Sequence, residues 1–230
     1  MENRAAADAA LAAIAQRALD FVADQAIVGL GTGRAALAFV HALGARVREG
    51  LRVQGISTSE ATATAARQLG IPLIGLEDTE AIDVTVDGAD EVDPQLNLIK
   101  GYGGALVREK IVAAASRTEI ILVGREKLVP VLGSRGVLPV EVITFALAFC
   151  KRRLVELGCR PELRLQAGSA FVSDGGNNIL DCRIAPLDAP AALEAAVTAI
   201  PGVIGTGLFL GIADRVLVGD AGAVQELRRA

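Results

Sequence analysis

The chain has 230 residues, of which 52% are hydrophobic and 22% are charged, and this composition excludes an intrinsically disordered protein. The formal net charge of −4 gives no basic surface for nucleic acid, and an aromatic content of 3% leaves few rings for base stacking. The length suits one large domain or two modest ones that fold without disulfides. We therefore expect a globular protein that has no nucleic-acid partner.

The three cysteines form neither an even framework nor a CxxC pair. Free thiols in a reducing compartment explain them best, so we predict a cytoplasmic location. The chain has a single histidine, His41, which disfavours multi-histidine metal sites. We predict no metal site, and an enzyme of this composition would rely on carboxylates and lysines for acid–base chemistry.

No segment predicts a signal peptide or a membrane helix. The N-terminal stretch carries Glu2, Arg4 and Asp8 among alanines and has no uninterrupted apolar segment. Residues 195–213 are uncharged, but Pro201, Gly202 and three further glycines interrupt them. We predict a helix end, a turn at 201–202 and a buried strand from Val203, and hence no membrane partner.

The first 130 residues alternate between helix and strand patterns. Predicted helices cover 3–22, 34–48, a segment from 57–60 to Gly70, and 105–116, and predicted strands cover 26–30, 51–56, 82–86 and 119–123. This alternation implies parallel strands joined by right-handed crossovers, with ligand-binding loops at the carboxyl ends of the strands. The predicted class is therefore α/β.

The regular alternation of helix and strand patterns ends at about residue 135. The patterns predict a strand at 137–142, a helix at 144–157, an extended segment at 163–165, a hairpin over 170–184 turning at 174–177, a helix at 190–199, strands at 203–209 and 215–219, and a short closing helix from about 221. We predict two domains: residues 1–135 with 211–230 form the parallel-sheet domain, and residues 136–210 form a smaller α+β domain.

The segment Gly29-Leu30-Gly31-Thr32-Gly33-Arg34 lies between a predicted strand and a predicted helix. Glycines allow the backbone to approach an anion, and the helix N-terminus supplies N–H groups. A dinucleotide site would need glycine at 34 and a carboxylate after the next strand, which instead ends in Ser57-Thr58-Ser59. We predict a phosphate or small-anion site, with a purely structural turn as the alternative, and expect the two loops side by side.

The sequence DGADEVD at 87–93 places four carboxylates directly after a buried strand. The spacing does not fit a calcium loop. A solvated acidic turn is the alternative, but the position at a strand end favours a functional role.

The next segment, KGYGGALVREK at 100–110, again places glycines before a helix, with Lys100 at its start. Apolar residues lie one turn before and one turn after Glu109, and at about 100° per residue the charged run 108–110 spans roughly 200° of the helix. Not all three side chains can face solvent if the helix is packed. A carboxyl group on an apolar wall has a raised pKa, which suits a general base. A buried ion pair is the alternative.

In this order and spacing, the motifs resemble type A ribose-5-phosphate isomerases. The resemblance runs from GLGTG at 29–33 through STSE at 57–60, DGADEVD at 87–93 and KGYGGALVREK at 100–110 to Lys127, LPVEV at 138–142, SDGGNNILD at 173–181 and PGVIGTGLF at 201–209. It covers essentially the whole chain, and the third and fourth motifs are highly specific.

The resemblance implies an enzyme without metal or cofactor that interconverts D-ribose 5-phosphate and D-ribulose 5-phosphate through a cis-enediolate, in the non-oxidative pentose phosphate pathway. It implies that Glu109 moves the proton between C2 and C1, that Asp87 helps to open the sugar ring, and that Lys100 offsets the enediolate charge. The implied substrate-binding residues are Gly31, Thr32, Gly33, Arg34, Ala35, Ser57, Asp87, Gly88, Ala89, Asp90, Lys100, Gly101, Tyr102, Gly103 and Lys127. It further implies a Rossmann-like first domain, a ferredoxin-like second domain and a homo-oligomer, either a dimer or a tetramer.

The chain departs from the family pattern after GTG, where Arg34-Ala35 replaces the usual Ser-Thr. Backbone N–H groups survive this change, and the Arg34 guanidinium offers a direct phosphate contact.

Three other classes share this architecture. A sugar-phosphate sensor of transcription would need a DNA-reading module, for which residues 1–22 are too short. A coenzyme A transferase would form a thioester at Glu109, and a NAD-dependent oxidoreductase would bind nucleotide; acyl-CoA trapping and nucleotide titration separate these from an isomerase.

Overall fold

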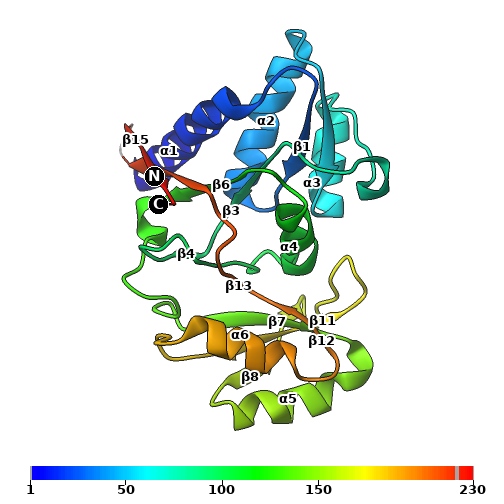
Figure 1. The fold of residues 1–230 in the computed structure, drawn as a ribbon, viewed down its shortest axis with the longest axis vertical. Coiled ribbons are helices and arrows are strands. Elements are labelled where there is room, and N and C mark those ends of the chain that lie inside the picture. Colours follow the sequence, from blue (N-terminus) through cyan, green and yellow to red (C-terminus); the bar gives the residue numbers. More distant parts are fainter. Residues whose placement is uncertain (1, 221–222, 230) are drawn as a thin grey trace. The chain divides into compact units, whose positions relative to one another are not determined.

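Short strands, most of them rich in apolar residues, build a mostly parallel sheet in this protein (Figure 1). The computed structural model describes residues 2–220 and 223–229, and it describes the side chains from residue 7 onward. The chain folds as two units. The first comprises Met1–Ala89, Glu109–Lys127 and Ile212–Ala230, and the second comprises Asp90–Arg108 and Leu128–Gly211.

The sheet of the first unit has the order β15-β14-β6-β3-β1-β2. Its strands are β1 (Ala26–Leu30), β2 (Val53–Ser57), β3 (Val84–Gly88), β6 (Glu119–Gly124), β14 (Arg215–Asp220) and β15 (Ala223–Arg228). Every neighbouring pair is parallel except β14 with β15, which form an antiparallel hairpin. The predicted α/β class with a parallel sheet is confirmed.

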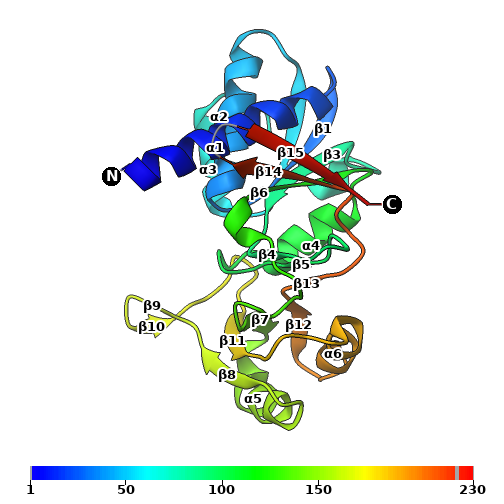
Figure 2. The same ribbon diagram turned by 90° about the vertical axis from the view of Figure 1, so that its left-hand side faces the viewer.

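Helices cover this sheet because alternate residues of each strand point to opposite faces. The helical elements are α1 (Glu2–Ala18), η1 (Leu19–Phe21), α2 (Arg34–Arg48), α3 (Glu60–Gln68), η2 (Leu76–Asp78), α4 (Leu106–Ala114) and η3 (Arg125–Lys127). Helices α1 and α2 lie next to each other over the sheet (Figure 2) and share an apolar core with Val28 and Leu30. Ile27, which precedes Val28 and so points to the other face of the sheet, packs in a second cluster with Val112 of α4. Helix α4 therefore lies on the opposite face from α1 and α2.

The second unit contains a four-stranded antiparallel sheet in the order β12-β7-β11-β8. The chain passes through β7 (Val137–Val142), η4 (Thr144–Ala146), α5 (Leu147–Glu156), β8 (Arg160–Leu163), β11 (Asn178–Arg183), α6 (Pro190–Thr198) and β12 (Val203–Thr206). Alternate strand residues such as Val140 and Leu180 pack against Leu154 of α5 and Val197 of α6. This βαββαβ order is the ferredoxin-like arrangement that the family resemblance implies.

Two small sheets complete the second unit. Strands β4 (Glu91–Val92), β5 (Leu98–Ile99) and β13 (Leu208–Phe209) form one, in the order β13-β5-β4. Strands β9 (Leu165–Gln166) and β10 (Ser169–Ala170) form the other.

The predicted closing helix from about residue 221 is wrong, because β15 occupies Ala223–Arg228 as the partner of β14. Val224 packs against the core, and Glu226, on the same side of the strand, accepts hydrogen bonds from Arg17 and Arg215. This two-residue alternation suits a strand and not a helix. Residues 221–222, where the prediction began, lie outside the described residues.

Three further predictions differ in detail from the structure. The predicted strand 203–209 divides at Gly207 into β12 and β13, which belong to different sheets. The turn at 174–177 is present, but a single bridge between Val172 and Asn178 replaces the predicted hairpin, and β11 pairs with β7 and β8. Residues 90–108 and 128–135, predicted in the first domain, group with the second unit because β4 and β5 pair with β13.

The predictions of free cysteines and of a helix end, a turn at 201–202 and a strand that begins at Val203 are confirmed. Cys150, Cys159 and Cys182 are free and buried. Helix α6 ends at Thr198, a turn follows with Gly202 at a φ of 97°, and β12 begins at Val203. Among the described residues, none of the helices combines the length and the hydropathy that crossing a membrane requires.

Candidate active site

Four neighbouring strands of the first unit, β6, β3, β1 and β2, end beside one another and carry predicted site residues. Gly31–Gly33 follow β1, Ser57 ends β2, Asp87 and Gly88 end β3, and Lys127 closes the 3₁₀ turn after β6. Parallel strands present their carboxyl ends at the same edge, which is where α/β proteins bind ligands. The fold of the first unit thus gathers these residues as the sequence predicts.

Asp87 is buried, and two backbone groups hold its carboxylate. Its Oδ1 accepts hydrogen bonds from Thr32 N at 3.1 Å and from Gly88 N at 2.7 Å. Gly31 packs directly against it, because a Cβ at Gly31 would lie 2.3 Å from both Cγ and Oδ1 of Asp87. Gly31 N in turn donates to Val86 O at 3.0 Å. The loop after β1 and the end of β3 therefore fix the position of the Asp87 carboxyl group together.

A chain of hydroxyl groups fastens the loop after β1 to the start of α3. Thr32 Oγ1 donates to Ser59 Oγ at 2.8 Å, Ser59 Oγ donates to Thr62 Oγ1 at 3.0 Å, and Thr62 Oγ1 donates to Gly31 O at 2.9 Å. Thr58 Oγ1 lies 2.7 Å from Thr32 Oγ1 and donates to Leu30 O. Each hydroxyl has one hydrogen to donate, so this chain leaves little freedom to the Thr32 side chain. The predicted proximity of the two loops is confirmed.

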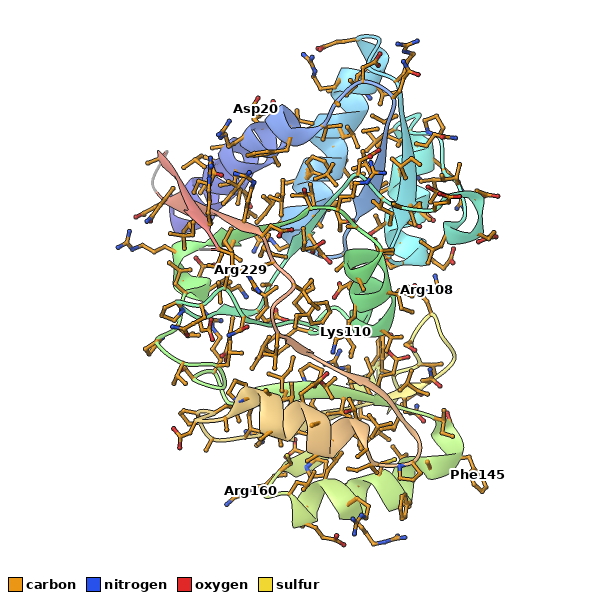
Figure 3. The ribbon with its side chains drawn as sticks, viewed as in Figure 1. Asp20, Arg108, Lys110, Phe145, Arg160 and Arg229 are labelled. Carbon is orange, nitrogen blue, oxygen red and sulfur yellow. The ribbon has the colours of Figure 1, made fainter. Side chains whose placement is uncertain are left out.

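Glu109 lies in the first turns of α4 and is 4% exposed. Its neighbours in sequence, Arg108 and Lys110, are only partly buried (labelled in Figure 3). The prediction that these three side chains cannot all face solvent is confirmed. The carboxyl group that the sequence singles out is the buried one.

The N-terminus of α2 carries the departure from the family pattern. Gly33 caps the helix with a φ of 101°, a conformation that favours glycine. The Arg34 guanidinium is exposed and donates to Asp8 Oδ1 of α1 at 2.8 Å. Ala35 is partly buried. At the start of an α-helix, the first N–H groups have no acceptor within the helix and offer hydrogen bonds to an anion.

In the second unit, Lys100 is 2% exposed and follows β5. Its N–H donates to Gly207 O at 2.9 Å, and its Nζ lies 5.4 Å from the centre of the Phe209 ring. A Cβ at Gly207 would lie 2.2 Å from Lys100 O, so only glycine permits this approach. Gly207, between β12 and β13, thus contacts the backbone of Lys100 closely.

The loop that follows Lys100 is tied to the acidic motif of the same unit. Tyr102 N donates to Asp90 Oδ2 at 3.0 Å, and Asp90 N donates to Ile99 O at 2.8 Å. Burial, together with the negative charge of Asp90, raises the pKa of Tyr102 to about 12. The phenol therefore stays protonated at neutral pH, and it donates weakly to Val137 O at 3.5 Å.

Two of the four carboxylates in the acidic motif have structural roles. Glu91 accepts from Gly133 N at 2.6 Å and from Arg135 N at 2.7 Å. Asp93 accepts from the backbone of Gln95 and Asn97. Both are buried, so the solvated acidic turn considered as the alternative does not describe them. Asp87 and Asp90 are the members of the motif that remain as candidates for chemistry.

The sequence analysis did not identify two residues, Thr62 and Arg164, that contact the predicted site residues. Thr62 closes the hydroxyl chain, and its place three residues after the helix cap Ser59 was a usable signal. Arg164 donates to the carbonyl groups of Gly101 and Tyr102, for which the sequence offers no signal. In the part of the chain that the structure describes, no group of three or more His, Cys, Asp or Glu side chains is placed to hold a metal ion.

Comparison with known proteins identifies the family of this chain. The family model of ribose 5-phosphate isomerase A (phosphoriboisomerase A) matches residues 54–222. Ribose-5-phosphate isomerase A of Gloeobacter violaceus is 53% identical over 214 residues, which are 93% of each chain. That of Roseiflexus castenholzii is 48% identical over 216 residues, covering 93% of this chain and 92% of the relative.

Solved structures are similar over nearly the whole length. Ribose 5-phosphate isomerase A of Methanocaldococcus jannaschii superposes with a TM-score of 0.91 at 38% identity, covering 95% of this chain and 98% of that one. A D-ribose-5-phosphate isomerase in complex with phospho-erythronic acid gives 0.92 at 39% identity, covering 96% and 98%. With these likenesses and the matched family model, the chain belongs to the ribose 5-phosphate isomerase A family.

Proposed function

We propose that this protein is an aldose–ketose isomerase that interconverts D-ribose 5-phosphate and D-ribulose 5-phosphate. Its membership of the family carries this proposal, because the matched segment 54–222 contains Asp87, Lys100 and Glu109. Going from the aldose to the ketose, the reaction moves one proton from C2 to C1 and one from the C2 hydroxyl to the C1 oxygen of the open-chain sugar. It needs a base for a proton next to a carbonyl group and a positive group near the oxygen that becomes negative.

Glu109 is the proposed base. It removes the C2 proton of the aldose, which leaves a cis-enediolate, and returns the proton to C1 to give the ketose. Its burial on a helix whose other residues around it are mostly apolar supports this role, because few water molecules compete with a bound sugar for the carboxyl group.

Asp87 is the proposed acid–base group for opening the furanose ring. Two backbone N–H groups hold its Oδ1 and so fix the orientation of the buried carboxyl group, which supports this role. We expect Asp87→Asn to slow the cyclic aldose more than the open-chain ketose. Pre-steady-state rates in both directions measure this, and equal losses would remove Asp87 from ring opening.

Lys100 is the proposed positive group that offsets the charge of the enediolate. Its burial supports this role, since a charge acts more strongly where water is excluded. Asp90, Gly101, Tyr102 and Gly103 are proposed to bind the sugar together with it.

The N-terminus of α2 is the proposed phosphate site. The N–H groups of Gly31 and Thr32 are engaged with Val86 and Asp87, so phosphate binding falls to the N–H groups that follow, from Gly33 to Ala35. Arg34 adds its guanidinium in place of the usual hydroxyls. Ser57, Gly88, Ala89 and Lys127 complete the proposed set of substrate contacts.

Deuterium exchange tests the reaction and the base together. In D₂O, the wild-type protein is expected to convert ribose 5-phosphate to ribulose 5-phosphate that carries deuterium at C1. Glu109→Gln keeps the shape of the side chain without the base, so we expect ligand binding to persist and turnover and exchange to be lost. Glu156→Gln, at an exposed position on α5, is the matched control.

The outcomes distinguish a wrong function from a wrong assignment of the base. No ribulose 5-phosphate from the wild-type protein would refute the proposed function itself. Near-normal exchange in Glu109→Gln would keep the function and assign the proton transfer to another group.

We further propose a cytoplasmic homo-oligomer, a dimer or a tetramer, that works in the non-oxidative pentose phosphate pathway without metal or cofactor. The free, buried thiols support a reducing compartment. Self-association is supported by apolar side chains on η4 and α5, where Phe145 is 99% exposed (Figure 3) and Phe149 is 41% exposed. Sedimentation velocity measures the subunit number, and activity after chelator treatment tests the absence of a metal.

A further inference from the structure

The loop from Lys100 to Gly104 is rich in glycine. It contains three glycines, of which Gly101 and Gly104 have φ values of 108° and 86°. Glycine-rich segments lose the most conformational freedom on ordering, so such a loop needs outside contacts to stay in one conformation. Within the loop, Gly104 N donates to Gly101 O at 3.0 Å. The contacts that decide its shape therefore come from elsewhere in the second unit.

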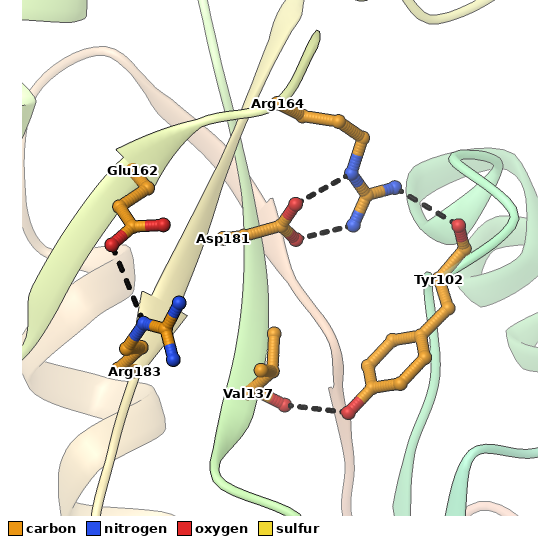
Figure 4. Close-up of a pocket in the computed structure, with 6 residues that line it drawn as sticks. All are labelled: Tyr102, Val137, Glu162, Arg164, Asp181 and Arg183. Atoms are coloured by element: carbon orange, nitrogen blue, oxygen red, sulfur yellow. Dashed lines mark hydrogen bonds and ion pairs between the residues drawn. The ribbon is translucent and has the colours of Figure 1, made fainter. Parts of the chain in front are cut away.

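Arg164 supplies such contacts through its guanidinium group (Figure 4). Nη1 donates to Gly101 O at 2.8 Å and to Tyr102 O at 3.2 Å. On its other side, Nε donates to Asp181 Oδ2 at 2.9 Å and Nη2 donates to Asp181 Oδ1. The guanidinium is planar and rigid, so the two bonds to Asp181 fix the direction in which Nη1 points.

A ring contact extends this arrangement to the other end of the loop. The Arg164 guanidinium lies 5.8 Å from the centre of the Phe171 ring, and Phe171 N donates to Arg164 O at 2.9 Å. The Phe171 ring covers Gly104, because a Cβ there would lie 2.4 Å from Cζ of the ring. Arg164 and Phe171 thus contact both Gly101 and Gly104, the two ends of the glycine loop.

The burial of Arg164 distinguishes it from a neighbouring ion pair. The Arg164 side chain is 13% exposed, whereas that of Arg183, in the same cavity of about 400 Å³, is 66% exposed and binds Glu162 at 3.3 Å (Figure 4). Both arginines thus pair with a carboxylate in the same cavity, and Arg164 in addition donates to the loop.

We propose that Arg164, held by Asp181, is a positioning residue that keeps the loop Lys100–Gly104 in its working conformation and so sets the position of Lys100. The inference rests on the proposed function, which gives Lys100 its role in the reaction. Lys100 is next in sequence to Gly101, whose carbonyl Arg164 holds, so a shift of the loop moves the lysine backbone. A displacement of about 1 Å at a charged group in an active site lowers the rate by up to 100-fold.

Arg164→Met tests the proposal, with Arg183→Met as the matched control. Methionine keeps the apolar length beside Phe171 and removes all five N–H donors of the guanidinium. We expect kcat for ribose 5-phosphate to fall at least tenfold in Arg164→Met and to change less than twofold in Arg183→Met. Arg164→Lys keeps the charge without the planar fork, and we expect it to recover part of kcat.

Tyr102 gives a second readout that does not depend on activity. It is the single tyrosine of a chain without tryptophan, so the intrinsic emission reports on this loop alone. We expect the fluorescence anisotropy of Tyr102 to fall in Arg164→Met because the loop gains mobility, and to be unchanged in Arg183→Met.

Equal kcat in the two methionine variants, or equal anisotropy, would overturn the proposal. If Arg164→Met fails to fold, the same two measurements, kcat and anisotropy, are made on Arg164→Lys and Arg183→Lys, and equal values in that pair would overturn the proposal. A wild-type protein without isomerase activity would refute the proposed function instead, and the anisotropy would still report whether Arg164 orders the loop.

Discussion

Replacing Gly31 by alanine is expected to disturb the position of Asp87 more than it disturbs the fold. The added Cβ would lie 2.3 Å from Cγ and Oδ1 of Asp87 and 2.6 Å from its Cα. The last of these is a backbone atom of β3, so a change of side-chain rotamer cannot relieve the contact. Either the loop after β1 or the end of β3 must move.

The distances set the size of the effect. Ordinary van der Waals contact begins near 3.4 Å, so Gly31 and Asp87 must separate by about 1 Å, a displacement that lowers activity by roughly 100-fold. In free energy this is about 2.7 kcal/mol of lost transition-state stabilisation. The accompanying overpacking lowers the free energy of unfolding by about 1–3 kcal/mol, and each kcal/mol lowers Tm by roughly 2–4 °C.

Steady-state kinetics with ribose 5-phosphate and thermal unfolding measure the two effects separately. Gly55→Ala is the control, because its Cβ would lie 2.7 Å from Leu30 Cδ1 and 3.0 Å from Leu73 Cδ2, the ends of flexible side chains. We expect the control to lose stability and keep its activity. A folded Gly31→Ala protein with kcat/KM close to wild type would refute the idea that this approach fixes a working Asp87.

Three further predictions concern charged and titrating groups. Arg34→Ala is expected to raise KM several-fold with a smaller change in kcat, because a phosphate contact serves the bound substrate and the transition state alike; an unchanged KM removes Arg34 from the phosphate site. Ultraviolet titration of Tyr102 is expected to give a pKa of about 12, so the stability linked to its proton is full below pH 10 and lost as the pH rises towards 12; a midpoint at 10 would show that partial desolvation and the charge of Asp90 do not act on the phenol. Arg228 and Arg215 lower the pKa of Glu226 to about 2, so Glu226→Gln should unfold more easily than wild type above pH 4.5, with the difference in Tm vanishing as the pH falls to 2; a difference that persists at pH 2 would show that lost packing causes it.

The local parts of the site were accessible from the sequence because their signals are local. The strand at 26–30, the glycine turn and the helix from Arg34 have the predicted bounds, since a buried strand, glycines and an amphipathic helix each show in a few neighbouring residues. Helical geometry predicts that at least one of the three successive charges 108–110 is buried, and the apolar residues one turn before and after Glu109 single it out. The shared edge of the strand ends follows from the parallel topology.

The C-terminal strand could not be found in this way. Residues 223–228 have the length and composition of a short helix, and their state is decided by β14, an exposed sheet edge that offers its backbone groups to a partner. The ion pairs of Glu226 with Arg17 and Arg215 further stabilise the extended conformation. Tertiary context overrides the local preference here, as is common for short strands.

The contact between Arg164 and the glycine loop could not be predicted from the sequence either. The acceptors are the carbonyl groups of Gly101 and Tyr102, and every residue carries such a group, so no residue type marks them as partners of an arginine. The donor lies in a segment whose sequence predicts only an extended chain, and its charge is paired with Asp181 seventeen positions later. The motif KGYGG therefore predicts a sharp bend in the loop. The side chain that stabilises this bend can be identified only from the structure, in which the ferredoxin-like sheet pairs β8 with β11. A residue that donates to backbone carbonyl groups, as Arg164 does, can therefore contribute to function as much as the residues of the motif. Only the fold shows which residue does so.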